Sequence, residues 1–468
     1  MSRLAQLFTL LVATCISLST QAGTTGTGVH LPEYTTTTLP NGATVLLMPR
    51  HDVPMIAASV WVRGGSLADA AGKEGTASLL ADLMEKGAGE RDALAFAQTV
   101  DGAGGSLSFG SSREAIVASA QFLSKDSGLM LSLLGDALLR PRMEAAEFDK
   151  LKKRAIDAIA SAKDGDPRGL IRNYTNAWLF QQHPYARPAD GDPTSLARIS
   201  MDDLKAFRNQ QMGGDRLIIA IVGDFDSAVI GKQVQSTFGS WAKAHAALPL
   251  VTAAQPRNGR RVLLVDKPGA TQTYFTLANL GTRHGDPDEA AQNVVQTVFG
   301  GRFTSMINTA LRIKSGLSYG AASQLERPRL PGTVAITSYT KTDSTKAAID
   351  LAISTLDLLH QQPLDSQAID SAKHYIAGQF APGLETSPQL AAELANMALY
   401  GDDRDEVDGY LGRIAAASPE QINAARKVFP DAADVVIVAI GDAAKIRSVM
   451  QAYGPLTEMK LTDPRYLP

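Results

Sequence analysis

Three oxygen-bearing side chains recur at helical spacing in the stretch from Gly75 to Gly87. Ser78, Asp82 and Glu85 occupy positions i, i+4 and i+7, so a helix would place them on one face. Carboxylate and hydroxyl oxygens suit Ca²⁺ or Mg²⁺, but such cations take about six or more oxygens, and only two of these side chains are charged. The pattern therefore favours a polar helix face lining a solvated cavity over a cation site.

Histidine and cysteine offer little metal or nucleophile chemistry in this chain. One cysteine is present, Cys15, and it lies within the first 22 residues. His183 precedes Pro184 without a catalytic partner at useful spacing, which predicts a structural turn. The spacing of Ser, Asp and Glu gives no support to an unrelated active site. No two of the seven histidines have the helical spacing of zinc ligands: His30, His51, His183, His245, His284, His360 and His374.

Arg312 and Tyr319 are a second candidate pair, within the segment Leu311–Gly320. A tyrosine hydroxyl can donate a hydrogen bond to a developing oxyanion, and a guanidinium can hold a substrate carbonyl through its fork of donors. The alternative is purely structural, with Tyr319 half-buried in a sheet and Arg312 an exposed cation at a helix end.

The apolar pattern predicts mixed helices and strands around these residues. Leu39–Gly42 contains Asn-Gly, a strong hairpin signal, and the glycine-rich stretch 102–110 leads into a strand pair. Ser200 is the expected N-cap of a helix that continues to Arg208. We expect strands over 43–48, 55–62, 115–121 and 217–222, and helices over 75–87, 127–139, 144–162 and 170–180.

The second half of the chain repeats the first. A shift of 218 residues places Ser200–Leu204 on Ser418–Ile422 and residues 216–224 on residues 434–442, without a gap. A slightly smaller shift places Val45–Leu47 on Val262–Leu264, and the helix of Gly75–Gly87 then falls on Glu289–Gly301. The expected fold class is α+β, with two homologous α/β repeats of about 220 residues. The predicted repeats are 23–247 and 260–468, joined by a linker over 248–259.

The order of these motifs resembles the pitrilysin/insulinase family of inverted zinc peptidases. The resemblance runs from Leu-Pro-Asn-Gly through the Gly75–Gly87 helix to His183-Pro-Tyr, and with the repeat it covers essentially the whole chain after residue 22. It implies a pitrilysin-like metallopeptidase fold, in which two repeats form one half of a clam-shell.

The family's zinc motif is lost here. That motif resembles Gly-Thr-Ala-His-x-x-Glu-His-x-x-x-Lys-Gly, in which two His and a later Glu bind zinc and the first Glu polarises the attacking water. The first His falls on Ser78, the Glu on Ala81, the second His on Asp82, and the third ligand on or beside Ala158. The resemblance therefore implies no metal and no cofactor in this chain, with zinc held by a partner subunit.

Two other family features are retained in outline. Residues 104–109 resemble a family strand that pairs with extended substrate through its backbone. The resemblance assigns peptide binding to Ser106, Leu107, Ser108 and Phe109. The family usually has Asn-Ala where this chain has Ser108-Phe109. Arg312 and Tyr319 match the family's Arg/Tyr segment, whose pair faces the zinc across the chamber. The implied role is catalytic, in trans to the zinc of the partner.

Composition and the first residues indicate where the protein works. Lys plus Arg number 45 and Asp plus Glu number 48, so the net charge is −3. This balance does not predict a basic surface that would bind nucleic acid. Arg3, the apolar run to Leu18 and the small residues before Gly23 predict a signal peptide over 1–22 and a periplasmic protein without a membrane span. Lipidation at Cys15 is the disfavoured alternative, because Thr14 suits that signal poorly.

Two functions follow as expectations. The first is the zinc-less, non-catalytic subunit of a heterodimeric peptidase, which needs a homologous zinc-bearing partner and acts on unfolded peptide. The alternative is a homodimeric peptide-binding or assembly protein without peptidase activity.

Overall fold

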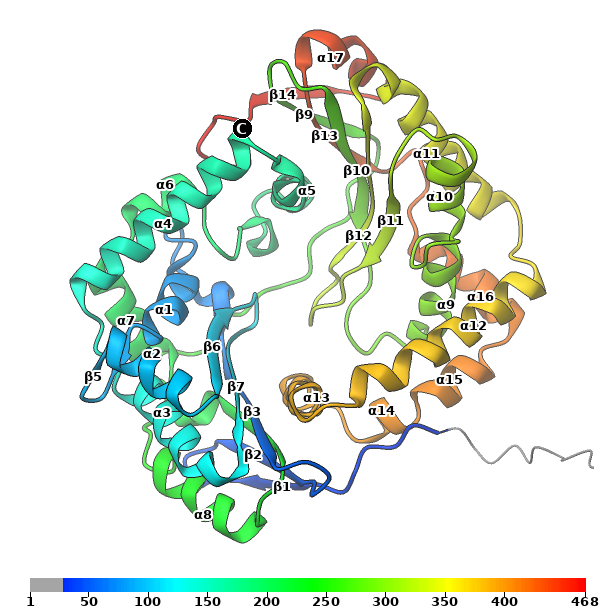
Figure 1. The fold of residues 1–468 in the computed structure, drawn as a ribbon. Helices are drawn as coiled ribbons and strands as arrows, with labels where there is room; N and C mark the ends of the chain where they lie inside the picture. Colours follow the sequence, from blue (N-terminus) through cyan, green and yellow to red (C-terminus); the bar gives the residue numbers. More distant parts are fainter. Residues whose placement is uncertain (1–27) are drawn as a thin grey trace, which may run out of the picture.

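Two six-stranded sheets, one in each half of the chain, form the framework of the protein (Figure 1). The computed structural model describes residues 28–468. The predicted signal peptide over 1–22 and Cys15 lie outside the described residues. Within those that are described, no helix has the combination of length and apolar character needed to cross a bilayer.

The first sheet has the strand order β1-β2-β8-β3-β7-β6. β8 runs parallel to β2 and antiparallel to β3, and its seven residues are all buried. Its strands are β1 (Thr35–Thr38), β2 (Thr44–Pro49), β3 (Met55–Arg63), β6 (Ser106–Ser111), β7 (Ala115–Leu123) and β8 (Leu217–Gly223). A short hairpin, β4 (Gly87–Ala88) and β5 (Arg91–Asp92), lies apart from the sheet.

The helices of the first half pack mainly on one face of this sheet, where they form the largest apolar core. Ser200 and Asp203 form a capping box at the start of α7, as the sequence predicts for Ser200. The helices are α1 (Thr76–Met84), α2 (Ala93–Gly102), α3 (Ser127–Leu139), α4 (Ala145–Asp164), α5 (Ile171–Phe180), α6 (Pro193–Arg198), α7 (Met201–Gln211) and α8 (Ser227–Phe238).

The second sheet has the order β11-β12-β10-β13-β9-β14. Its strands are β9 (Arg261–Asp266), β10 (Gln272–Leu280), β11 (Ala321–Leu325), β12 (Thr333–Lys341), β13 (Val436–Gly441) and β14 (Leu456–Lys460). The helices are α9 (Glu289–Phe299), α10 (Met306–Asn308), α11 (Thr345–Gln361), α12 (Ser366–Phe380), α13 (Ser387–Tyr400), α14 (Asp405–Asp408), α15 (Tyr410–Ala416), α16 (Pro419–Ala425) and α17 (Ala443–Gln451).

The two sheets repeat one topology, which confirms the predicted fold class. Five strands correspond in order, since β2-β8-β3-β7-β6 matches β9-β13-β10-β12-β11. The remaining edge strand differs: β1 precedes β2 and pairs antiparallel with it, whereas β14 comes at the end of the second half and pairs parallel with β9. Residues 239–260, between α8 and β9, contain no helix or strand.

Each half also contributes one helix to the sheet of the other half. α5 from the first half packs on β10 and β13, and α13 from the second half packs on β3 and β8. Both helices lie between the two sheets in Figure 1. The α13 residues Leu390, Ala391 and Leu394 contact the side of the first sheet that is opposite its main core. Both faces of each sheet are therefore covered, which explains the unbroken apolar runs in β8 and β13.

Candidate functional site

Helix α1 begins at a backbone position that requires glycine. Gly75 has φ of 97°, and a Cβ at this position would lie 3.0 Å from the carbonyl oxygen of Asp190. The Asp69 carboxylate, 4% exposed, accepts hydrogen bonds from the backbone N–H groups of Gly75 at 2.8 Å and Ala77 at 2.9 Å. Burial raises the pKa of Asp69 to about 7, although the N–H groups of Ala77 and Gly75 oppose this shift.

Helix α1 carries the three positions at which the sequence predicts the lost ligands and base, Ser78, Ala81 and Asp82. Ser78 Oγ donates a hydrogen bond to Asp190 Oδ1 at 3.1 Å. Burial and the neighbouring Glu85 raise the pKa of Asp82, while Arg154 on α4 lowers it. Ala81 is fully buried in the main core and presents only a methyl group. No general base faces this site from position 81.

Helix α4 packs against α1 but supplies no third ligand. Ala158 is exposed, and the neighbouring Asp157 points to solvent, where it pairs with Lys153. Across residues 28–468, no group of three or more His, Cys, Asp or Glu side chains is arranged to hold a metal ion. The side chains at Ser78, Ala81, Asp82 and Ala158 therefore do not fit the zinc site of the family.

Glu85 contacts a strand edge, which sequence reasoning did not find. Its carboxylate accepts the backbone N–H of Phe109 in β6, the outermost strand of the first sheet. Ser106–Phe109, the predicted peptide-binding residues, pair with β7 on one side only. Because backbone groups alternate along a strand, the N–H of Leu107 points to the same open edge as that of Phe109. Glu85 therefore already satisfies one of the donors that an added strand would use.

The Arg312 segment has unusual backbone geometry. Thr309–Lys314 forms a π-helical turn, a feature found frequently at functional sites. The Arg312 guanidinium lies 4.9 Å from the centre of the Phe303 ring. Tyr319 precedes β11 and is 74% exposed, so the alternative expectation of a half-buried tyrosine is wrong. α10, which leads into this turn, lies on the opposite side of the molecule from α1 (Figure 1).

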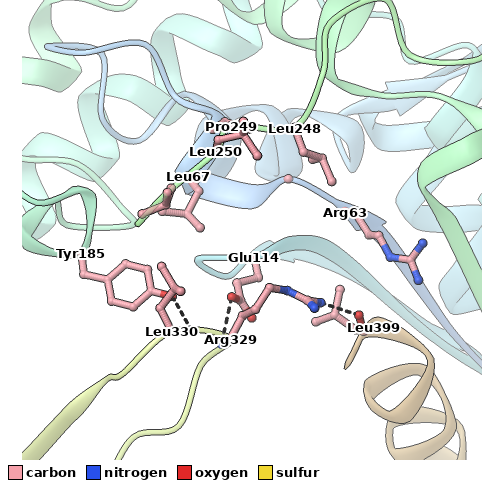
Figure 2. A pocket seen from close by; sticks show the side chains of 12 residues that line it. Arg63, Leu67, Glu114, Tyr185, Leu248, Pro249, Leu250, Arg329, Leu330 and Leu399 are labelled. Atoms are coloured by element: carbon pink, nitrogen blue, oxygen red, sulfur yellow. Dashed lines mark hydrogen bonds between the residues drawn. The ribbon is translucent and has the colours of Figure 1, made fainter. Parts of the chain in front are cut away.

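A cavity of about 270 Å³ lies where the two halves meet. Figure 2 shows its polar groups converging from both halves: Glu114 Oε1 accepts the backbone N–H of Arg329 at 3.2 Å, and Arg329 donates to the carbonyl oxygen of Leu399 at 2.7 Å. Tyr400 donates its hydroxyl to Glu114 Oε2 at 2.7 Å. Leu248 lines the same cavity. These bonds leave Glu114 engaged in joining the halves.

His183 makes the contacts of a structural turn. Its Nδ1 accepts the N–H of Tyr185 at 3.1 Å, and its Nε2 lies 2.7 Å from the carbonyl oxygen of Thr252. Burial lowers the pKa of this imidazole, although its contact with the Thr252 backbone opposes the shift. Both nitrogens are therefore occupied by backbone groups.

The fold and the degenerate helix together define a two-repeat metallopeptidase homologue. The profile of the family described as "Insulinase (Peptidase family M16)" matches residues 44–192, and the profile described as "Peptidase M16 inactive domain" matches residues 198–376. This chain belongs to the M16 peptidase family.

Three relatives support the assignment. An uncharacterized zinc protease of Mycobacterium tuberculosis is 26% identical over 391 residues, which cover 83% of this chain and 89% of the relative. The uncharacterized zinc protease YmxG of Bacillus subtilis is 23% identical, over 84% of this chain and 95% of the relative. A probable mitochondrial-processing peptidase subunit beta of Arabidopsis thaliana is 25% identical over a match that covers 58% of this chain and 51% of the relative.

Solved structures show the same fold. A structure of the peptidase M16 inactive domain from Pseudomonas fluorescens superimposes with a TM-score of 0.81 at 24% identity, covering 88% of this chain and 98% of that one. A protease from Helicobacter pylori superimposes with a TM-score of 0.80 at 19% identity, covering 88% of this chain and 100% of that one.

Proposed function

We propose that this chain is the zinc-less subunit of a two-chain M16 peptidase. The observation that carries the proposal is the contrast between its two halves. Helix α1 is kept in place by Gly75 and Asp69, but its ligand and base positions are Ser78, Ala81 and Asp82. The second half instead presents Arg312 and Tyr319 to solvent. A homologous chain would hold the zinc, and this pair would complete that chain's site.

The proposed chemistry of this pair is transition-state stabilisation. The Tyr319 hydroxyl would donate to the oxyanion that forms when water attacks the peptide carbonyl, and the Arg312 fork would hold a neighbouring substrate carbonyl. Neither group needs a metal in its own chain for this role. The open edge of β6 would position an extended, unfolded peptide through its backbone groups.

The names of relatives support an assembly of chains. The Arabidopsis relative is named a subunit of a processing peptidase, and we extend a subunit role to this chain. We further propose that the protein is exported to the periplasm after removal of residues 1–22, where unfolded peptides of exported proteins would be its substrates.

The test is Tyr319→Phe in the complex reconstituted with a zinc-bearing homologue. Loss of one donor to the oxyanion lowers turnover by about 10²- to 10³-fold in comparable enzymes, and we expect a fall of that order. Zinc content, measured by elemental analysis, should not change. Tyr34→Phe removes a hydroxyl from the first half and serves as the matched control. Wild-type turnover of the Tyr319→Phe complex would refute the proposed role.

The second candidate is a homodimeric peptide-binding or assembly protein without a peptidase partner. The open edge of β6 favours this candidate, because strand addition needs no metal. The neighbouring gene and the oligomeric state distinguish the two functions. An adjacent gene for an exported chain of similar length with an intact His-x-x-Glu-His supports the heterodimer, whereas a stable, peptide-binding homodimer without such a neighbour supports the binder.

A further inference from the structure

A cavity of about 500 Å³ next to the π-helical turn is lined by arginines and aromatic rings from both halves of the chain. We call it the arginine–aromatic cavity. Arg168, from the first half, reaches it through the short turn Pro167–Leu170 that precedes α5. The residues that the argument uses are Arg168, Arg302, Phe303, Arg312, Tyr339 and Tyr375.

Arg168 lies over two tyrosine rings of the second sheet. Its guanidinium is 4.5 Å from the centre of the Tyr339 ring and 5.7 Å from that of Tyr274. Its nearest carboxylate, Asp166, is 3.6 Å away, and both side chains are more than half exposed. Tyr274 and Asp166 engage part of the guanidinium, and because it carries five N–H donors, others stay available for a ligand in the cavity.

Arg302 is a partly buried cation of this wall, and its hydrogen bonding is incomplete. One of its nitrogens, Nη1, donates to Ser371 Oγ at 2.8 Å, while its buried Nε has no hydrogen-bond partner in the described chain. Among residues 28–468, no carboxylate lies within 4.0 Å of the guanidinium of Arg302 or of Arg312. A partly buried guanidinium without a counter-charge favours binding of an anion.

Aromatic rings next to these cations remain open to solvent. Phe303 is 59% exposed and Tyr375 is 41% exposed, which is high for large apolar side chains. Phe303 also stacks with Arg312. The cavity therefore offers a fixed positive charge beside an apolar surface, and a complementary ligand carries a carboxylate next to an apolar group.

We propose that the arginine–aromatic cavity binds a peptide carboxylate that lies beside an aromatic or aliphatic side chain. The carboxylate belongs either to an Asp or Glu side chain or to a free C-terminus, since both present the same two oxygens to a guanidinium. This inference rests on the proposed function only in that the chain binds peptide. In this proposal Arg168 and Arg302 select peptides that carry the carboxylate, whereas Tyr319 acts on the reacting carbonyl and does not select among peptides.

The test measures peptide binding to the isolated full chain by fluorescence anisotropy, without zinc or a partner. Three peptides, each labelled with fluorescein at the N-terminus, share the sequence Gly-Ser-Gly-Phe-X, in which X is the last residue: X is Glu with an amidated end, X is Gln with a free carboxylate, and X is Gln with an amidated end. We expect one carboxylate peptide to bind at least about tenfold more tightly than the neutral peptide, the usual size of a charge-assisted hydrogen bond. Which peptide gains identifies the source of the carboxylate.

Arg168→Gln and Arg302→Gln should each reduce this preference by about tenfold. Arg447→Gln is the matched control, because Arg447 on α17 pairs with Glu458 on β14 and does not line the cavity. Arg168 is exposed and tolerates substitution, so the test remains decisive if Arg302→Gln unfolds. Equal binding of all three peptides, absence of binding, or a preference that survives Arg168→Gln would overturn the proposal. The turnover of the Tyr319→Phe complex decides the proposed peptidase role separately.

Discussion

Asp69 is the residue that holds the start of α1, and no sequence pattern distinguishes it among 48 acidic residues. It lies seven positions before Thr76, the first residue of α1, outside N-cap spacing, and reaches the helix only because the chain folds back through the loop between them. Its carboxylate accepts two N–H groups at the positive end of the helix. Burial is the larger effect and raises its pKa to about 7.

Asp69→Asn should therefore change how stability depends on pH. Between pH 4 and 7, folded Asp69 retains a proton that the unfolded chain has released, so stability falls as pH rises through this window. Relative to Asp69→Asn, the wild-type free energy of unfolding should fall by about 3 kcal/mol from pH 5 to pH 8, measured by urea denaturation. Asp226→Asn, at the exposed N-cap of α8, is the control substitution. A constant difference between wild type and Asp69→Asn would contradict the assignment.

Motif spacing assigns the lost zinc-site positions to particular residues of α1, but it does not predict what those residues contact. Ser78 and Asp82 could be located because an intervening helical turn fixes their separation. The partner of Ser78, Asp190, is 112 positions away in the sequence. The partner of Glu85, the N–H of Phe109, is a backbone group and leaves no trace in residue type. Contacts of this kind depend on tertiary structure alone.

At the scale of the element, α1 retains the form of a ligand-bearing helix. Gly75 and Asp69 fix its start, and α4 packs beside it. We therefore expect the triple variant Ser78→His, Asp82→His and Ala158→Glu to bind zinc, because two imidazoles one turn apart and a carboxylate on α4 form a three-ligand set. Elemental analysis of the purified variant should give about one zinc per chain.

The triple variant should remain unable to hydrolyse peptides, because Ala81 is buried and supplies no base. The double variant without Ala158→Glu is the matched control and should bind zinc at least about tenfold more weakly. If the triple variant takes up no more zinc than the double variant, α4 does not present position 158 to α1. The restored helix then differs from the family arrangement in the placement of α4.

The repeat was the most predictable part of the fold. The strands expected over 43–48 and 55–62 are β2 and β3, and the helix expected over 289–301 is α9. These strand and helix predictions agree with the structure because the spacing of apolar residues depends directly on local structure. Helix α9 continues through Phe299, and only the glycines that follow it form the turn. Phe299 is buried, and its packing in the second core extends the helix.

At the scale of the whole molecule, the exchange of α5 and α13 joins the halves. An amphipathic pattern predicts that a helix buries one face, but it does not say which sheet receives that face. The shift of 218 residues places α5 on α13, so the exchange is reciprocal, and each sheet needs the other half to cover one face.

Leu394→Ala, a substitution in the second half, should therefore loosen the sheet of the first half. Leu394 is fully buried in the cluster that also contains Ile218 and Met48, and such truncations cost about 2–5 kcal/mol. Hydrogen–deuterium exchange read by mass spectrometry should show faster exchange in β3 and β8, on which α13 packs. Leu356→Ala on α11 removes the same atoms from the second half's own core and is the matched control. It should increase exchange mainly in β12 and α11. If Leu394→Ala instead leaves β3 and β8 protected while the second half loosens, α13 stabilises its own half, and the two halves can fold without each other.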